Sequence, residues 1–275
     1  MSDAAIAYPR NDNAVDYALQ VTRNYLHMLS QRAIGIEGAR ILEIGPGADF
    51  AAQLVMASLG AEVTLADRFL ARWDADFHPG FYRAFLERWD GPKAAIEAAL
   101  ARGGYDGVLR LLPEPAEAMA GIADGSLDLV LSNAVLEHVR DMGSVVREMA
   151  RITKPGGIQA HQVDCRYHRD FSRPLDHLLI PEAEFAAERE RTGCVHGTQM
   201  RLQEIAECFA ATFWIDEIEP NAFAEPAYLD ALRPRLAGRF ATFPRQTLRI
   251  TGGRLWLSRK ATGPKARRWW LWGGN

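Results

Sequence analysis

A short apolar run that ends in a glycine loop is the feature that most constrains the fold of this chain. Residues 41–50 read ILEIGPGADF, so a predicted buried strand runs into Gly45, Pro46 and Gly47 and then into a helix. Glycine allows a tight turn and leaves the backbone bare, so a ligand can approach the main chain there. The pattern predicts a strand–loop–helix unit of an α/β fold with a ligand site at the loop.

Strand and helix patterns alternate along much of the chain. Apolar runs predict strands at 40–44, 61–66, 107–112, 127–132, 158–163, 213–218 and 247–257, and helical spacing predicts helices at 15–29, 50–59, 144–152 and 200–210. A further helix is expected between Pro92 and Gly103, and residues 154–157 (KPGG) predict a hard turn. Such alternation predicts a mainly parallel sheet with helices on both faces.

Composition excludes several classes of protein. The 275 residues carry 32 Lys and Arg against 35 Asp and Glu, a net charge of −3, which disfavours a dedicated nucleic-acid binder. Cys165, Cys194 and Cys208 lack the spacing of a zinc or iron–sulfur site, and so sparse a count is typical of a reducing compartment. The N-terminus lacks the pattern of a signal peptide, and no apolar run is long enough to span a bilayer. We therefore expect a cytoplasmic protein.

The residues after the glycine loop favour a cofactor without phosphates. A dinucleotide fingerprint requires a third glycine at position 50, where this chain has Phe50. Asp49 lies at the start of the predicted helix, where a carboxylate satisfies free amides but repels a pyrophosphate. Nicotinamide and flavin dinucleotides are therefore disfavoured.

Three motifs in order resemble the class I S-adenosylmethionine (SAM)-dependent methyltransferases. Residues 43–47 (EIGPG) resemble the first motif of that family, and Asp67 lies where the family places the acid that binds the ribose hydroxyls. Residues 124–157 resemble the family's fourth strand and the helix and turn that follow, and are most similar to the small-molecule group called type 11. The resemblance covers residues 38–160. It implies a Rossmann-like, seven-stranded, mainly parallel sheet with helices on both faces and an antiparallel last strand.

The resemblance also implies a cofactor and the residues that bind it. SAM is the expected cofactor, with S-adenosylhomocysteine as its product. Glu43 is expected to hold the loop and face the methionine end of SAM. Asn133 and Ala134, just past the fourth strand, are expected beside the methionine part. The acid that contacts adenine is expected after the third strand, where Glu114 and Glu117 are candidates and Glu114 is our choice. The expected cofactor-binding set is Glu43, Gly45, Pro46, Gly47, Asp67, Arg68, Glu114, Asn133 and Ala134.

Histidines near the predicted strand ends are the candidate catalytic residues. Methyl transfer depends mainly on alignment, but a hydroxyl acceptor benefits from a general base, and the ordinary pKa of histidine suits that role. His138 follows the fourth strand, and His161, Asp164 and His168 lie on or just beyond the fifth, where the carboxylate can orient a base. A divalent metal held by His161, Asp164 and His168 is the alternative. It is disfavoured because only one carboxylate has a useful spacing.

These observations predict one domain over residues 1–275 with a SAM-binding core at 38–160. Acceptor-side cap elements are expected at 1–35, 68–106 and 164–200, and the aromatic residues between Trp73 and Trp89 either pack as a helix face or supply a lid. Residues 265–272 (KARRWWLW) predict either docking on the domain or a homodimer partner, or peripheral contact with an acidic membrane.

The predicted function is SAM-dependent methylation of a small molecule at a hydroxyl, of the sugar or natural-product type. A lipid-linked membrane acceptor and a non-catalytic SAM-binding module are the alternatives.

Overall fold

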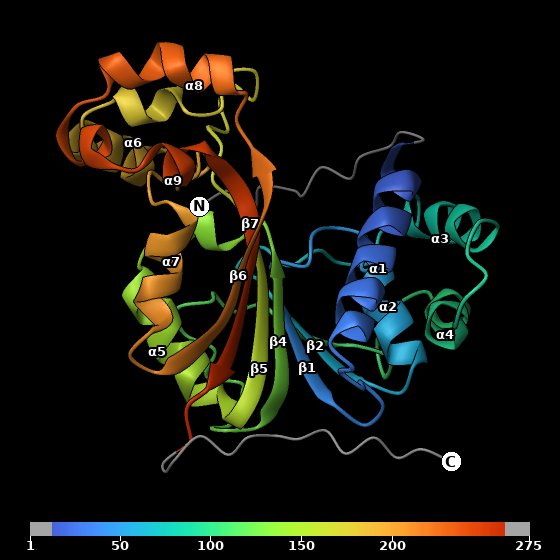
Figure 1. The fold of residues 1–275 in the computed structure, drawn as a ribbon. Helices are drawn as coiled ribbons and strands as arrows, with labels where there is room; N and C mark the ends of the chain where they lie inside the picture. Colours follow the sequence, from blue (N-terminus) through green and yellow to red (C-terminus); the bar gives the residue numbers. More distant parts are fainter. Residues whose placement is uncertain (1–12, 262–275) are drawn as a thin grey trace.

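A single seven-stranded sheet organises residues 13–261, the part of the chain that this computed structural model describes (Figure 1). The strand order is β3-β2-β1-β4-β5-β7-β6, and β7 runs antiparallel to both of its neighbours while β1 to β5 are parallel. The strands are β1 (Arg40–Ile44), β2 (Glu62–Ala66), β3 (Arg110–Leu112), β4 (Leu127–Asn133), β5 (Thr153–Asp164), β6 (Phe213–Phe223) and β7 (Ile250–Arg259). The predicted fold class is confirmed.

Helices cover both faces of the sheet. One layer contains α1 (Asn13–Gln31), α2 (Ala51–Ser58), α3 (His78–Leu86) and α4 (Ala94–Arg102), and the other contains α5 (Met142–Ile152) and α7 (Leu202–Phe209) (Figure 1). Successive side chains of a strand point to opposite faces, so Ile41 packs with the first layer and Leu42 with the second. Each layer thus has its own hydrophobic core, and the sheet separates the two.

Strand β5, which follows α5, begins earlier in the chain than predicted. Residues 154–157 were expected as a turn before the strand, whereas β5 begins at Thr153 and includes them. Leu127 pairs with Thr153 and Leu129 with Ile158, so β5 advances five residues while β4 advances two. Pro155 has no N–H to donate and Gly156 has a φ of 77°, so the segment bulges out of the ladder instead of ending it.

The aromatic segment after β2 packs into the core of the first layer. Phe77, Phe81, Tyr82, Phe85 and Trp89 are all buried and belong to the same cluster as the apolar residues of α1 and α2. These side chains therefore form helix packing rather than a lid, and only residues 68 and 69 of the expected element 68–106 border the cleft described below.

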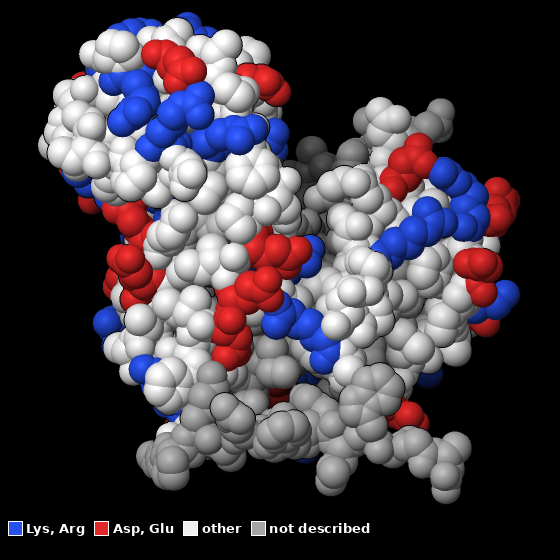
Figure 2. Space-filling model, in the orientation of Figure 1, with Lys and Arg blue, Asp and Glu red and all other residues white. Residues whose placement is uncertain are grey.

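A separate lobe lies beyond the carboxyl ends of the parallel strands (Figure 1). It contains the short helices η2 (Asp176–Leu179), α6 (Glu182–Thr192), α8 (Pro226–Leu232), η3 (Arg233–Arg235), η4 (Gly238–Thr242) and α9 (Arg245–Arg249). Leu175 and Leu178 share its core with Leu229 and Leu248, so the expected cap element 164–200 is joined by residues 226–249, which the sequence did not indicate. Figure 2 shows the surface hollowed between this lobe and the α1 side.

Two expectations from the sequence concern membranes. None of the helices within residues 13–261 is long and apolar enough to cross a bilayer. The basic and tryptophan-rich segment 265–272 lies outside the described residues.

Candidate cofactor cleft and histidine cluster

The glycine loop after β1 packs directly against the connection that follows β4. Gly45 and Gly47 have φ values of 62° and 77°. A side chain at Gly45 would place its Cβ 2.5 Å from Cγ2 of Val135, whereas one at Gly47 would meet nothing within 4 Å. Gly45 is therefore required both by its backbone conformation and by the close approach of Val135.

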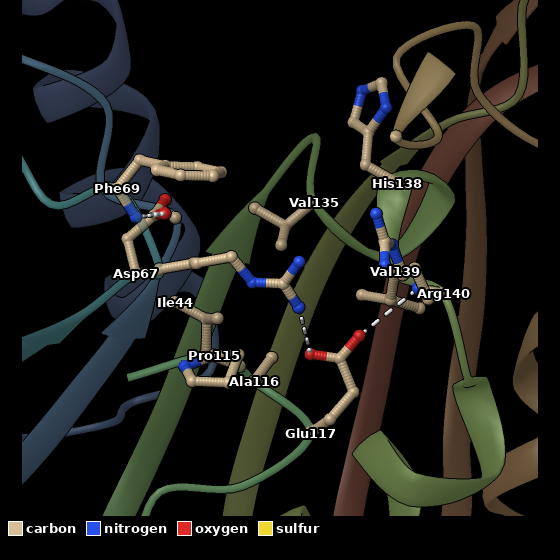
Figure 3. Close-up of a pocket in the computed structure, with 13 residues that line it drawn as sticks. Ile44, Asp67, Phe69, Pro115, Ala116, Glu117, Val135, His138, Val139 and Arg140 are labelled. Carbon is tan, nitrogen blue, oxygen red and sulfur yellow. Dashed lines mark hydrogen bonds and ion pairs between the residues drawn. The ribbon is translucent and has the colours of Figure 1, made fainter. Parts of the chain in front are cut away.

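A cleft opens beside this loop, where the chain reverses its direction of winding between β1 and its neighbours β2 and β4. Ligands of open α/β sheets bind outside the carboxyl ends of strands at such a switch point. Apolar side chains form much of the surface, and acidic and basic groups stand at its rim (Figure 3). The lining residues are Ile44, Gly45, Asp67, Arg68, Phe69, Pro115, Ala116, Glu117, Val135, His138, Val139, Arg140 and Gly193.

Asp67 stands at the end of β2, as expected from the sequence. Its N–H donates to the carbonyl of Leu112 at 3.3 Å, and its Oδ1 accepts from the N–H of Phe69 at 2.8 Å (Figure 3). Phe69 is 65% exposed and is available to a planar ligand. The cleft thus offers a carboxylate and an aromatic ring to one ligand.

The acid after β3 that reaches the cleft is Glu117, not Glu114. Glu117 lies 3.8 Å from the guanidinium of Arg68 and accepts a hydrogen bond from the N–H of Arg140 at 3.2 Å (Figure 3). Glu114 instead accepts from the N–H of Gly121 at 3.1 Å and is not among the lining residues. The structure therefore does not place Glu114 in the cleft, because the two carboxylates on the irregular backbone after β3 have different hydrogen-bond partners.

Glu43 supports the loop from the side away from the cleft. It is 2% exposed and accepts hydrogen bonds from the Tyr25 hydroxyl at 2.8 Å and from Nε2 of Gln53 at 2.5 Å. Burial raises its pKa to about 7, against the two hydrogen bonds that favour the charged form. Glu43 therefore joins β1 to α1 and α2 and does not line the cleft.

Other expected cofactor residues lie near the cleft without lining it. Nδ2 of Asn133 donates to the Tyr17 hydroxyl at 3.3 Å, and Ala134 has a φ of 56° and donates its N–H to the carbonyl of Gln162 at 2.9 Å. Pro46 and Gly47 continue the loop beyond Gly45. From this part of the chain the sequence analysis missed Val135, which follows Ala134 and closes the cleft.

His161 is a core residue and does not line the cleft. It is fully buried, with Nδ1 2.8 Å from the Ser132 hydroxyl and Nε2 3.0 Å from Oε1 of Gln159. Burial lowers the pKa of His161 to about 3, so the ring is neutral. Its expected role on the acceptor side was wrong because its side chain points into the core behind α7, where it packs against Phe209.

The other three predicted catalytic residues come together. The rings of His138 and His168 are 4.7 Å apart, and Nε2 of His168 lies 3.7 Å from Oδ2 of Asp164. Nδ1 of His138 lies 2.9 Å from the carbonyl oxygen of Cys194. His138 lines the cleft, and its ring points away from the apolar floor (Figure 3).

The pKa values of Asp164 and His138 are both shifted from their ordinary values. Burial alone would raise the pKa of Asp164, but His168 and the Arg166 guanidinium 2.6 Å away lower it well below its ordinary value. Burial lowers the pKa of His138. Asp164 is therefore a fixed negative charge beside a histidine pair, of which His138 lines the cleft.

Two residues near the histidines were missed by the sequence analysis. Glu137 is fully buried, and its Oε1 accepts from the N–H of Asp164 at 3.2 Å. Arg189 in α6 donates to the carbonyl of Glu137 at 2.9 Å and that of Val139 at 2.8 Å, which ties the lobe to the cleft. The adjacency of Glu137 and His138 was the available signal for the first, and none was available for the second.

Parts of this chain are similar in sequence to known methyltransferases. Residues 84–160 match the family model described as a methyltransferase domain. A ubiquinone biosynthesis O-methyltransferase of Pectobacterium carotovorum is 33% identical over 132 residues, which cover 48% of this chain and 46% of that protein. An arsenite methyltransferase of Aquipseudomonas alcaligenes is 32% identical over 129 residues, which cover 44% of this chain and 32% of that protein. The matches thus span less than half of the length of these curated relatives.

A solved structure shares the fold of this chain. A candidate sarcosine dimethylglycine methyltransferase from Galdieria sulphuraria aligns with a TM-score of 0.51 over 88% of this chain and 86% of that one, at 15% identity. At this identity the likeness concerns the fold alone. Together with the sequence matches it confirms the resemblance to class I SAM-dependent methyltransferases.

Proposed function

We propose that this chain transfers the methyl group of SAM to a hydroxyl of a small-molecule acceptor. The observation that carries the proposal is one cleft at the switch point of the sheet that combines Gly45, Asp67 and Glu117 with the histidine pair at its edge. The sequence matches to methyltransferases, one of them an O-methyltransferase, support the same reaction class.

The cleft residues suit the parts of SAM. A carboxylate accepts hydrogen bonds from both hydroxyls of a vicinal diol, so Asp67 binds the ribose. Glu117 accepts from the amino group of adenine, and the apolar side chains of Ile44, Ala116 and Val135 contact the ring. The open backbone at Gly47 leaves room for the methionine portion. Arg68, paired to Glu117, positions that acid.

The histidine pair suits the activation of a hydroxyl. SAM supplies an electrophilic methyl group on its sulfonium, so the chain must align the acceptor oxygen and remove its proton as the carbon–oxygen bond forms and the carbon–sulfur bond breaks. The Cys194 carbonyl can only accept, so Nδ1 of His138 carries a proton and Nε2 is free to take one. Asp164 stabilises the positive charge that His168 acquires when it takes a proton.

The test is the formation of S-adenosylhomocysteine by the full chain with SAM and a panel of hydroxyl acceptors, each paired with its amine analogue. We expect turnover with a hydroxyl acceptor and a loss of at least tenfold in kcat for His168→Gln. His27→Gln, on the exposed face of α1, is the matched control and should retain full activity.

Three other results would each overturn part of the proposal. Turnover with the amines alone would reject the hydroxyl acceptor. Turnover only with acceptors carried in anionic vesicles would favour the lipid-linked alternative. SAM binding without product from any acceptor, unchanged by His168→Gln, would favour a non-catalytic SAM-binding module.

A further inference from the structure

We propose that Glu137, His138 and His168 form a binding site for one divalent transition-metal ion at the edge of the cleft. One ligand atom from each of the three side chains lies within 4.8 Å of the others. Glu137 and His138 come from the 3-10 helix η1 (Leu136–His138) after β4, and His168 comes from the loop after β5. The two parallel neighbours β4 and β5 therefore bring the three ligands to one place.

Two buried polar atoms of this group lack a hydrogen-bond partner. Oε2 of Glu137 has none although the residue is fully buried, and Nε2 of His168 has none although it is excluded from solvent. A buried polar atom left without a partner costs about 1–3 kcal/mol, and more when it is charged. A cation bound between Oε2 of Glu137 and Nε2 of His168 provides a partner for both atoms. It therefore offsets the cost of burying them.

The second polar atoms of His138 and Glu137 are held by the protein. Nδ1 of His138 faces the carbonyl of Cys194 at 2.9 Å, so its lone pair is on Nε2, the atom left for a metal. Oε1 of Glu137 accepts from the N–H of Asp164. Metal-binding histidines usually donate their second N–H to a carbonyl or carboxylate, which fixes the ring. The supporting contacts of such a site are thus in place.

The nature and charge of the ligands select the class of metal. Two imidazole nitrogens and a carboxylate suit Zn²⁺, Co²⁺, Fe²⁺ or Mn²⁺, whereas Mg²⁺ and Ca²⁺ prefer oxygen ligands alone. Asp164 adds a second negative charge 3.7 Å from His168 and is itself held by Arg166. Arg189 is the opposing cation, but it donates to backbone carbonyls.

The presence of Glu137 changes the sequence-based expectation that no metal binds here. That expectation counted one carboxylate, Asp164, and the fold supplies a second. If methyl transfer to a hydroxyl is correct, the metal lowers the pKa of the acceptor hydroxyl, and the two histidines act through it rather than as free bases. This role rests on the proposed function, but the binding site does not.

The test is a titration of the chelator-treated, untagged full chain with Co²⁺ and Zn²⁺, followed by calorimetry and by the visible absorption of Co²⁺. We expect one equivalent to bind and the Co²⁺ spectrum of a histidine–carboxylate site. Glu137→Gln and His168→Gln should each weaken binding at least tenfold, and His27→Gln, a histidine outside the group, should not change it.

A second measurement needs no variant. Addition of Zn²⁺ to wild-type protein should shift the ¹⁵N resonances of two of the seven histidine side chains. The site is rejected if the wild type binds no metal saturably, if more than two histidines respond equally, or if both Gln variants bind as the wild type does. Metal binding without methyl transfer would reject the proposed function alone, and metal-independent methyl transfer by a chain that binds no metal would reject the site alone.

Discussion

Alanine at Gly45 tests whether close packing of the glycine loop against Val135 shapes the cleft. The substitution places a Cβ 2.5 Å from Cγ2 of Val135 at a residue whose φ is 62°. Gly47→Ala is the matched control, because Gly47 has a similar φ of 77° but its Cβ would meet nothing within 4 Å. The two variants therefore share the backbone strain and differ in the steric contact.

The magnitudes follow from these two contributions. A side chain in the left-handed region costs about 1–2 kcal/mol in either variant. Overpacking adds about 1–3 kcal/mol for Gly45→Ala alone, because a methyl group of Val135 must move. We expect the free energy of unfolding to fall by about 2–5 kcal/mol for Gly45→Ala and by about 1–2 kcal/mol for Gly47→Ala. Val135 lines the cleft, so its displacement should also weaken SAM binding in Gly45→Ala.

Urea unfolding measures the stability of both variants, and calorimetry measures their affinity for SAM. Val135→Ala removes the clashing methyl group, so in a double-mutant cycle it should restore most of the overpacking loss of Gly45→Ala. Equal losses in stability and SAM affinity for Gly45→Ala and Gly47→Ala, or a cycle with no coupling between positions 45 and 135, would refute the reasoning.

Three further predictions concern buried side chains. Burial raises the pKa of Glu43 from its ordinary 4.5 to about 7, so the folded protein holds this proton more tightly than the unfolded chain. The free energy of unfolding should therefore fall by about 3 kcal/mol as pH rises from 4.5 to 7, and Glu43→Gln should remove that decline in urea titrations at pH 5 and 8. Phe85→Ala should destabilise the chain by about 3–5 kcal/mol in urea unfolding without changing SAM affinity, because Phe85 is fully buried away from the cleft. His161→Leu should cost about 2 kcal/mol by leaving Ser132 and Gln159 unsatisfied, with the KM for SAM unchanged in steady-state kinetics.

Each of these predictions has a result that contradicts it. If the free energy of unfolding of Glu43→Gln changes with pH in the same way as that of the wild type, the raised pKa of Glu43 is contradicted. Weaker SAM binding in Phe85→Ala at unchanged stability would support the lid interpretation of the aromatic segment. A stable His161→Leu variant with impaired kinetics would return His161 to the active site.

The strands and helices that position the cleft could be predicted from local patterns. The strand 40–44 was predicted at its observed bounds, because an apolar run ends there in a glycine, and Gly103 ends α4 in the left-handed conformation expected of a helix cap. Asp67 lies in the cleft because it follows the carboxyl end of β2, and β2 runs parallel to β1, whose carboxyl end leads into the glycine loop.

The remainder depends on contacts that sequence spacing does not encode. Glu137 and His168 are 31 positions apart and meet only because β4 and β5 are neighbours, so the second carboxylate of the group was missed. Glu114 and Glu117 differ by three positions in an irregular segment, where no periodicity fixes the direction of a side chain. The helices between residues 226 and 249 are three to seven residues long, too short to show helical spacing.

Calorimetric titration with SAM tests most directly the claim that this cleft binds the methyl donor. Asp67→Asn keeps an oxygen that can accept from the Phe69 N–H but loses the charge, and Asp106→Asn on the exposed loop before β3 is the matched control. We predict one bound equivalent for the wild type and Asp106→Asn, and at least about fivefold weaker binding for Asp67→Asn, since hydrogen bonds to a charged group are about 1–2 kcal/mol stronger than neutral ones. No saturable binding by the wild type, or equal affinity in all three proteins, would contradict the claim.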